Sequence, residues 1–312
     1  MKKNRGTDHP AKPFVKWAGG KSQLLDEISG ALPAHFQQTP FTYIEPFVGG
    51  GSVLFWILQT YPNIKKAIIN DINADLINTY RTIKENVEAL ILVLKDWEKE
   101  YYSLNANHNL KKAYYYTKRD LFNSRSSDNT TQAALFIFLN RTCFNGLYRV
   151  NRNNEFNVPI GSYKKPLICD EDNLRAVNRT LQKVTILNGD FEQTLKYAEG
   201  DTLFYLDPPY KPLSKTSSFN SYAKEVFDDK EQIRLARFCK KLDSLGYRWI
   251  LSNSDVKGKN PEDNFFDDLY AGFNIRRVWA RRNINANPAK RGELTELLIT
   301  NYEYEKAVSI AK

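Results

Sequence analysis

The chain has few cysteines and no long apolar run. Cys143, Cys169 and Cys239 are an odd number, and they lack CxxC or Cys/His spacing, so the sequence indicates neither a disulfide framework nor a zinc site. No apolar run approaches the roughly 20 residues that a helix needs to cross a bilayer. The basic N-terminus is not followed by the apolar core of a signal peptide. We therefore expect a globular, cytoplasmic protein that has no membrane partner.

Acidic residues are scarce in the middle of the chain. The formal net charge is +9, and residues 105–185 contain 13 Lys or Arg against six Asp or Glu. A solvated helical face would explain scattered basic residues, but here they are interleaved with aromatic, Asn and Gly residues. That composition is typical of surfaces that contact phosphates and bases. We therefore expect this segment to bind nucleic acid.

Short β-rich runs alternate with amphipathic helical patterns, which predicts an α/β fold with a mostly parallel sheet. The predicted strands are 41–47, 66–71, 184–189, 202–206, 247–252, 274–280 and 297–302, and the predicted helices are 21–32, 52–59, 74–94, 131–139 and 229–245. The short polar loop 281–292 predicts a hairpin and an antiparallel edge strand. The interval 73–184 is too long for a crossover connection. We therefore expect a catalytic core of residues 1–75 and 184–312, with a nucleic-acid-reading insertion of residues 76–183.

A rigid polar turn follows one of the apolar runs. Asp207-Pro208-Pro209-Tyr210 comes directly after Thr202–Leu206, and two successive prolines can neither continue a helix nor donate to a sheet ladder. The Asp207 carboxylate and the Pro208 carbonyl could accept both hydrogens of an exocyclic amine, while the Tyr210 ring could stack on a base. The turn therefore suits adenine or cytosine. The alternative is an Asp that only caps a turn.

A glycine-rich loop, Glu45-Pro-Phe-Val-Gly-Gly-Gly-Ser52, follows the first predicted strand and opens a helix. Residues without side chains let a ligand approach the backbone and the helix N-terminus. About 20 residues later, Asp71 ends the next strand, where a carboxylate reaches a ribose diol in doubly wound nucleotide folds. The loop lacks the last glycine of the dinucleotide pattern GxGxxG, so S-adenosylmethionine fits better than NAD.

Two further segments have alternative interpretations. Gly19-Gly-Lys-Ser22 lacks the first glycine of the Walker A pattern, because Val15 stands there. This disfavours a nucleoside triphosphate site, and the glycines then form a turn before a helix, where a cofactor could touch them. Asp190 follows the third predicted strand, where it either meets an adenine amine or N-caps the next segment.

Five blocks, in this order, resemble the Dam-type (alpha class, D12 class) DNA adenine-N6 methyltransferases that act on GATC. The blocks are Phe14-Val-Lys-Trp-Ala-Gly-Gly-Lys21, Tyr43-Ile-Glu-Pro-Phe-Val-Gly-Gly-Gly51, Asn70-Asp-Ile-Asn73, Asn140-Arg-Thr-Cys-Phe-Asn-Gly-Leu-Tyr-Arg149 with Glu155-Phe-Asn-Val-Pro159, and Asp207-Pro-Pro-Tyr210. They span nearly the whole chain. The resemblance implies a Rossmann-like S-adenosylmethionine-dependent methyltransferase core with a helical target-recognition insertion.

The resemblance also implies roles for residues in and near these blocks. The cofactor would be bound by Trp17, Ala18, Gly19, Lys21, Glu45, Pro46, Phe47, Gly49, Gly51, Ser52, Asp71, Ile72, Asp190 and Phe191. The target adenine would be held by Asp207, Pro208, Pro209 and Tyr210. DNA would be contacted by Lys16, Arg141, Phe144, Asn145, Leu147, Arg149, Asn157, Pro159 and Lys164.

Within this set, Phe144 would fill the gap left by a flipped base, and Arg149 would read guanine. Ser162 stands where relatives commonly carry Arg. One contact to a phosphate or base therefore differs, and the stringency for GATC could relax there.

The expected reaction is direct in-line transfer of a methyl group from S-adenosylmethionine to N6 of a flipped adenine in double-stranded DNA, without a metal or a covalent intermediate. No Cys-Pro pair provides the nucleophile that ring-carbon methylation requires. The alternatives are a DNA-binding protein with a vestigial core, methylation of RNA adenine or of cytosine N4, and a nucleotide-dependent enzyme such as a helicase. We expect a monomer. The sequence leaves open a role beside a cognate restriction endonuclease encoded nearby, with no direct contact implied, a housekeeping role and a phage origin.

Overall fold

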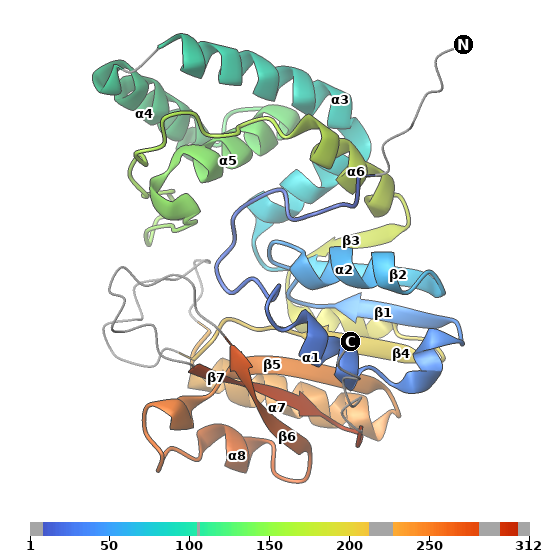
Figure 1. Ribbon diagram of the computed structural model, residues 1–312. Helices are drawn as coiled ribbons and strands as arrows, with labels where there is room; N and C mark the ends of the chain where they lie inside the picture. Colours follow the sequence, from blue (N-terminus) through green and yellow to red (C-terminus); the bar gives the residue numbers. More distant parts are fainter. Residues whose placement is uncertain (1–8, 105–106, 212–226, 281–293, 305–312) are drawn as a thin grey trace, which may run out of the picture.

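The strands form one seven-stranded sheet in the order β3-β2-β1-β4-β5-β7-β6 (Figure 1). The computed structural model describes residues 9–104, 107–211, 227–280 and 294–304. The strands are β1 (Phe41–Glu45), β2 (Ile64–Asp71), β3 (Val184–Asn188), β4 (Thr202–Leu206), β5 (Arg248–Ser254), β6 (Asn274–Ala280) and β7 (Leu294–Thr300). Strands β1 to β5 are parallel, and β7 is antiparallel to β5 and β6. The predicted α/β class with a mostly parallel sheet is confirmed.

The antiparallel end of the sheet places the last strand inside and β6 at the edge. The run Leu297, Leu298 and Ile299 in β7 is completely buried, as suits a strand covered on both faces. In contrast, β6 carries Arg276 and Arg277, and charged side chains are common on edge strands. The last strand begins and ends earlier than the predicted range 297–302. The hairpin loop predicted at 281–292 lies outside the described residues.

Each central strand contributes to two apolar cores, because successive side chains of a strand point to opposite faces. In β1, Tyr43 joins the cluster on one face and Ile44 joins the cluster on the other. The first cluster includes residues of α1 (Leu25–Ala31), α2 (Ser52–Thr60) and α3 (Ala74–Ser103), and the second includes residues of α7 (Asp229–Ser244) and α8 (Phe265–Leu269). This double coverage explains why β1 and β4 are buried along their whole length.

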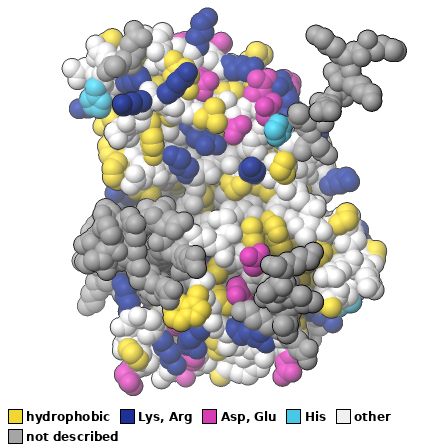
Figure 2. Space-filling model, viewed as in Figure 1, with side chains coloured by type: hydrophobic (Ala, Val, Ile, Leu, Met, Phe, Trp, Pro, Cys, Tyr) yellow, Lys and Arg dark blue, Asp and Glu magenta, His cyan; other side chains and the backbone are white. Residues whose placement is uncertain are grey.

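A helical segment lies between β2 and β3, beyond the β3 edge of the sheet (Figure 1). It consists of α3, α4 (His108–Ser124), α5 (Asn129–Thr142) and α6 (Glu171–Leu181). Helix α5 is its centre, since every residue from Gln132 to Asn140 is buried. Lys and Arg side chains are scattered over the outer surface of this segment, with Asp and Glu among them (Figure 2).

The sequence patterns underestimated this segment. Helix α3 extends nine residues beyond the predicted end at 94, to Ser103, and α4 and α6 were not predicted. Their N-caps, Asn107 and Asp170, accept backbone N–H groups of the first turn. These caps are the local signals that could have located both helices.

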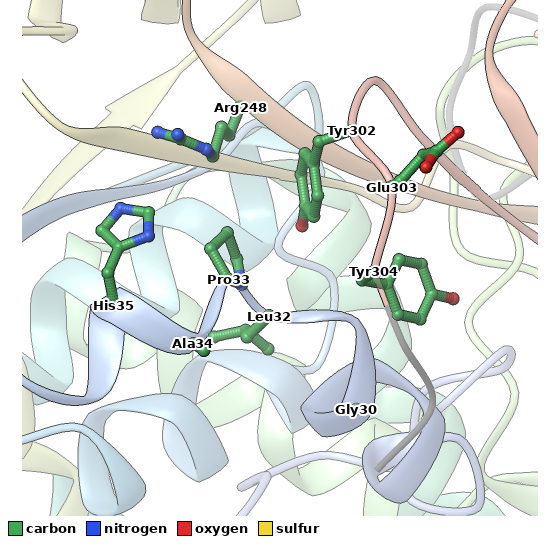
Figure 3. A pocket seen from close by; sticks show the side chains of 9 residues that line it. All are labelled: Gly30, Leu32, Pro33, Ala34, His35, Arg248, Tyr302, Glu303 and Tyr304. Atoms are coloured by element: carbon green, nitrogen blue, oxygen red, sulfur yellow. The ribbon is translucent and has the colours of Figure 1, made fainter.

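A cavity of about 420 Å³ opens at the amino ends of the parallel strands (Figure 3). Its lining includes His35, Arg248 and Tyr302, which lie before β1, at the start of β5 and after β7. This edge of the sheet is opposite to the edge that carries the predicted site residues. In the part of the chain that the structure describes, no helix is long and apolar enough to cross a membrane.

Candidate active site

Four acidic residues predicted from the sequence meet at the carboxyl edge of the sheet. Glu45 and Asp71 end β1 and β2, Asp190 follows β3, and Asp207 follows β4. These parallel strands are neighbours in the order β3-β2-β1-β4. Their ends therefore bring the carboxylates to one edge, which is the usual ligand site of an open parallel sheet.

The Asp207 carboxylate holds a buried ammonium group. Lys21 Nζ lies 2.9 Å from Asp207 Oδ1, donates to the Gly19 carbonyl at 2.8 Å, and lies 4.4 Å from the ring centroid of Tyr210. The Lys21 side chain is only 4% exposed. Burial raises the pKa of Asp207 to about 6, Lys21 opposes this shift, and the charge of Glu296 adds to it. At neutral pH the carboxylate is therefore mostly ionised and paired with a cationic nitrogen.

The turn after β4 is fixed to the sheet by two buried amides. The Pro209 carbonyl accepts a hydrogen bond from Gln232 Nε2 at 3.1 Å, and Gln232 Oε1 accepts one from Asn253 Nδ2 at 3.1 Å. Gln232 and Asn253 are completely buried, so these bonds are shielded from competing water. Pro208 is buried beside them, whereas Pro209 is exposed.

The Tyr210 side chain is held at its hydroxyl group. It donates to Glu296 Oε2 at 2.6 Å, and Glu296 lies in β7, far along the chain from the turn. Sequence reasoning missed Glu296 together with Gln232 and Asn253. A carboxylate inside the apolar run Leu294–Thr300 was the available signal for Glu296. The two buried amides carry no local pattern that distinguishes them.

Glu45 and Asp71 differ in the groups that donate hydrogen bonds to their carboxyl oxygens. Glu45 is 2% exposed and accepts the Tyr43 hydroxyl at 2.8 Å. Burial raises its pKa well above the usual range, and the nearby charges of Asp207 and Asp71 act in the same direction. Asp71 accepts the N–H of Gly49 at 3.0 Å and that of Asn73 at 2.9 Å. Burial raises the pKa of Asp71, and these backbone bonds oppose the rise.

The glycine loop is shaped by aromatic neighbours as well as by its turn. Gly49 and Gly51 have φ values of +48° and +78°, which favour glycine. A Cβ on Gly49 would lie 2.9 Å from the Trp17 indole, and one on Gly51 would lie 2.5 Å from the Tyr80 hydroxyl. Trp17 also stacks on Tyr148, with centroids 5.6 Å apart. The loop, Trp17 and a ring of the helical segment therefore form one packed unit.

A buried amide that sequence reasoning did not assign links the loops after two strands to the end of a third. Asn70 is 1% exposed, and its Nδ2 donates to the carbonyls of Pro46 and Gly189 at 3.0 and 2.9 Å. Its Oδ1 accepts from Gln193 Nε2 at 2.9 Å. Asn70 thus fixes the loops after β1 and β3 to the end of β2.

Asp190 N-caps the 3₁₀ helix Phe191–Tyr197, as one of its two sequence interpretations proposed. Its Oδ1 accepts the Glu192 N–H at 2.9 Å, and Arg234 donates to Oδ2 at 2.7 Å. Burial raises the pKa of Asp190, but the bonds from Arg234 and Glu192 outweigh it, and the net pKa is lowered. Phe191 is buried, packing against Phe47 with centroids 5.2 Å apart. The Phe191 ring therefore packs against the loop after β1 at the carboxyl edge of the sheet.

The remaining predicted cofactor residues lie around this edge. Ile72 follows Asp71 and is 47% exposed, an unusual exposure for a large apolar side chain at a strand end. Ser52 begins α2, directly after Gly51. Ala18 is exposed, and Gly19 has φ +79° beside the Lys21 ammonium.

The predicted DNA-binding residues gather on a turn and the strand-like segment opposite it. Phe144 is 51% exposed, Asn145 is exposed with φ +55°, and Pro159 is exposed. The Phe144 N–H donates to the Pro159 carbonyl at 2.8 Å. Further along, Arg149 Nε donates to Asn157 Oδ1 at 2.7 Å. The two segments, 143–150 and 156–160, therefore present these side chains together.

Asn140, which sequence reasoning did not assign, ties this turn to the segment before Trp17. Its Oδ1 accepts the Lys16 N–H at 2.7 Å, while its Nδ2 donates to the carbonyls of Lys16 and Gly146 at 2.8 and 3.0 Å. Lys16 Nζ reaches the Tyr163 hydroxyl at 3.1 Å. The buried Asn140 side chain therefore joins the two predicted binding regions.

Two of the remaining predicted DNA-binding residues, Arg141 and Leu147, are less exposed than the third, Lys164. Arg141 is half-buried and donates to the Phe14 carbonyl at 2.9 Å. Leu147 is half-buried beside the turn, whereas Lys164 is exposed. The Lys164 carbonyl accepts a hydrogen bond from Lys111 Nζ at 3.0 Å.

Comparisons with known proteins show the family of the chain. The family described as D12 class N6 adenine-specific DNA methyltransferase matches residues 17–284. The chain is 50% identical over 295 residues to the type II methyltransferase M.MjaIII of Methanocaldococcus jannaschii, covering 93% of this chain and 99% of that protein. It is 38% identical to the DNA adenine methylase of Haemophilus influenzae, covering 92% of each chain, and 33% identical to that of Escherichia coli K12, covering 96% and 95%. The chain therefore belongs to the D12 class of N6 adenine-specific DNA methyltransferases.

Proposed function

We propose that this enzyme transfers the methyl group of S-adenosylmethionine to N6 of adenine within GATC sites of double-stranded DNA. The observation that carries the proposal is the arrangement of Asp207, Lys21 and Tyr210. The Asp207 carboxylate accommodates a cationic nitrogen beside an aromatic ring face. An exocyclic amine that is being methylated develops positive charge, and a carboxylate fixed in advance stabilises that charge.

The carboxyl edge of the sheet fits an adenosyl cofactor. Asp71 is held by two backbone N–H groups and has further oxygen lone pairs for ribose hydroxyls. The exposed Ile72 next to it offers apolar surface to an adenine ring. The glycine loop before α2 lets a ligand approach the backbone at a helix N-terminus. The cofactor would supply a methyl group on a sulfonium sulfur.

In the proposed reaction the protein positions the target amine. Asp207 and the Pro208 carbonyl accept its two hydrogens, which favours a pyramidal nitrogen with an available lone pair. The Tyr210 ring stacks on the flipped base. The base must first leave the duplex, at a cost of a few kcal/mol. The exposed Phe144 suits an apolar wedge that fills the vacated stack and offsets part of that cost.

Sequence reading is assigned to the turn around Phe144 and to Arg149. Bidentate Arg to guanine O6 and N7 is the commonest specific base contact, and the Asn157 amide orients the Arg149 guanidinium. Lys16, in the core part of the chain, is bound to Tyr163 of the insertion, so both parts contribute to this surface. Ser162 precedes Tyr163 and is exposed.

The type II name of the M. jannaschii relative supports a role beside a restriction endonuclease.

The test is transfer of labelled methyl from S-adenosylmethionine to two duplexes, one with a single GATC and the other with GTTC. We expect label on GATC alone, recovered as N6-methyladenine, and none with the Asp207→Ala variant, which should still bind DNA. Label on both duplexes would contradict the assigned specificity. Full activity of Asp207→Ala would contradict the assigned catalytic residue, while no transfer by the unmodified enzyme would contradict the reaction.

A further inference from the structure

Glu296 connects the far end of the sheet to the turn that follows β4. It lies in β7, opposite Ser254 of β5 and Val278 of β6, and beyond residues 17–284 that the family comparison matches. Its neighbours Leu297 and Leu298 are buried in the two apolar cores. Glu296 instead accepts the Tyr210 hydroxyl at 2.6 Å. Strand β7 thus places the Glu296 carboxylate next to Tyr210 in the turn after β4, although β5 lies between β4 and β7.

The Tyr210 ring is constrained at two places besides its backbone. A short hydrogen bond to a carboxylate fixes the position of its hydroxyl, and bonds of this kind are stronger than those between neutral groups. The Lys21 ammonium lies 4.4 Å from the ring centroid, a distance at which a cation is attracted to the face of the ring. The hydrogen bond thus restrains where the far end of the ring lies, and the ammonium group restrains the plane of the ring.

A ring that stacks on a flipped base must be oriented before the base arrives. A misplacement of about 1 Å can cost two orders of magnitude in rate. A tyrosine held only by its backbone can swing about the Cα–Cβ bond, whereas a bound hydroxyl restricts that swing and an ammonium over one face restricts rotation of the ring plane. Neither Lys21 nor Gln232 contacts the hydroxyl group among the described hydrogen bonds.

We propose that Glu296 is a positioning residue, which holds the Tyr210 ring in the position from which it stacks on the target adenine. The inference rests on the proposed function, since it assumes that Tyr210 receives the base. Glu296 touches neither substrate and acts through the tyrosine hydroxyl. Its removal should therefore slow methyl transfer in the bound complex more than it weakens DNA binding.

A double-mutant cycle tests this directly. Glu296→Ala and Tyr210→Phe each remove one side of the hydrogen bond, so we expect each to lower kcat by roughly tenfold, a barrier change of about 1.4 kcal/mol. Their combination should lower kcat no further, because a single interaction is lost. The KM for a GATC duplex should change little. Glu296→Gln keeps an oxygen acceptor and should recover much of the lost rate.

A second readout separates positioning from general damage. A GATC duplex with 2-aminopurine at the target adenine is dim while the flipped base stacks on a ring and brighter when it does not. We expect brighter emission from the complex with Glu296→Ala than from the unmodified complex. Glu303→Ala is the matched control, because Glu303 lies at the opposite edge of the sheet (Figure 3) and should alter neither rate nor emission.

The contrary outcomes are distinct. Losses that multiply in the double variant would overturn the inference, because Glu296 would then act independently of the tyrosine hydroxyl. Unchanged kcat in Glu296→Ala, beside an active unmodified enzyme, would overturn it as well. An unmodified enzyme that transfers no methyl group would overturn the proposed function and this inference with it.

Discussion

The carboxyl edge of the sheet and the turn of the helical segment are built in opposite ways. At the edge, Lys21 and Glu45 are 4% and 2% exposed, and the acidic and basic side chains are bound to one another, to the backbone or to tyrosine hydroxyls. At the turn, Phe144 is 51% exposed and Asn145 is exposed, although the backbone between them is firmly held. Stabilising a developing charge requires groups fixed in advance and shielded from water. Reading a duplex requires side chains that extend into solvent.

The two regions are nevertheless joined by side-chain contacts. Asn140 binds the backbone of Lys16 and of Gly146, and Trp17 stacks on Tyr148. A short segment, Lys16 and Trp17, therefore belongs to both regions at once. Substitutions on either side of this segment should separate chemistry from recognition, and substitutions within it should disturb both.

The largest effect is expected at the edge. Asp207→Asn keeps the size of the side chain and removes its charge, so the developing positive charge on the amine loses its partner. We expect kcat to fall by about 10²- to 10³-fold, as when one stabilising group of a preorganised site is removed. The dissociation constant for a GATC duplex, measured by titration, should stay within a few-fold. A fall in DNA affinity of the same size as the fall in kcat would contradict the separation of the regions.

At the turn, Arg149→Ala should affect recognition and spare the chemistry. Loss of a bidentate guanine contact costs about 1 to 3 kcal/mol of discrimination against a wrong base. We therefore expect kcat/KM to fall for GATC duplexes but hardly for duplexes altered at the guanine. Arg152→Ala is the matched control, because Arg152 is an exposed neighbour, and it should weaken all duplexes equally. Equal loss on both kinds of duplex in Arg149→Ala would exclude base reading.

Between the regions, Asn140→Leu removes three hydrogen bonds of a buried side chain. Unpaired buried groups cost about 1 to 3 kcal/mol, so the free energy of unfolding in urea should fall by that amount. The KM values for DNA and for S-adenosylmethionine should both rise. Asn178→Leu is the control, since Asn178 Nδ2 binds the carbonyls of Ile83 and Lys84 in α3. It should destabilise the fold without changing either KM.

The residues that could be predicted from the sequence differ in kind from those that could not. Asp71 ends an apolar strand and Asp190 and Asp207 follow apolar strands, so local pattern predicted the position of each at the end of a strand. The residues that hold the site together are bonded to partners remote in sequence. Asn140 binds Lys16 across 124 positions, and Glu296 binds Tyr210 across 86. No local pattern encodes such pairs, because they depend on how strands and helices are finally packed.

The elements of the fold also divide into those that a local sequence pattern predicted and those that it did not. The strand pattern predicted the class of the sheet, since buried parallel strands are continuous apolar runs. The helical patterns did not predict α4 and α6, whose sequences are mostly polar on the exposed side. The predicted start of the final strand was three residues late. Asn140 and Asn70 stand within the five blocks of the resemblance, but neither was assigned a role, because their hydrogen-bond partners lie far away in the sequence.

The smallest predicted effect is on the pH dependence of the methylation rate, and it tests the charges at the carboxyl edge of the sheet. In the proposed reaction the Asp207 carboxylate must be ionised to stabilise a developing cation, and burial raises its pKa to about 6. The methylation rate should therefore be halved near pH 6 and fall further in more acidic solution. Lys21 opposes the rise and Glu296 adds to it, so Glu296→Gln should move this acid limb to lower pH. Glu303→Gln, remote from the edge, should leave it unchanged. An acid limb that stays fixed in Glu296→Gln would show that a group other than Asp207 controls it.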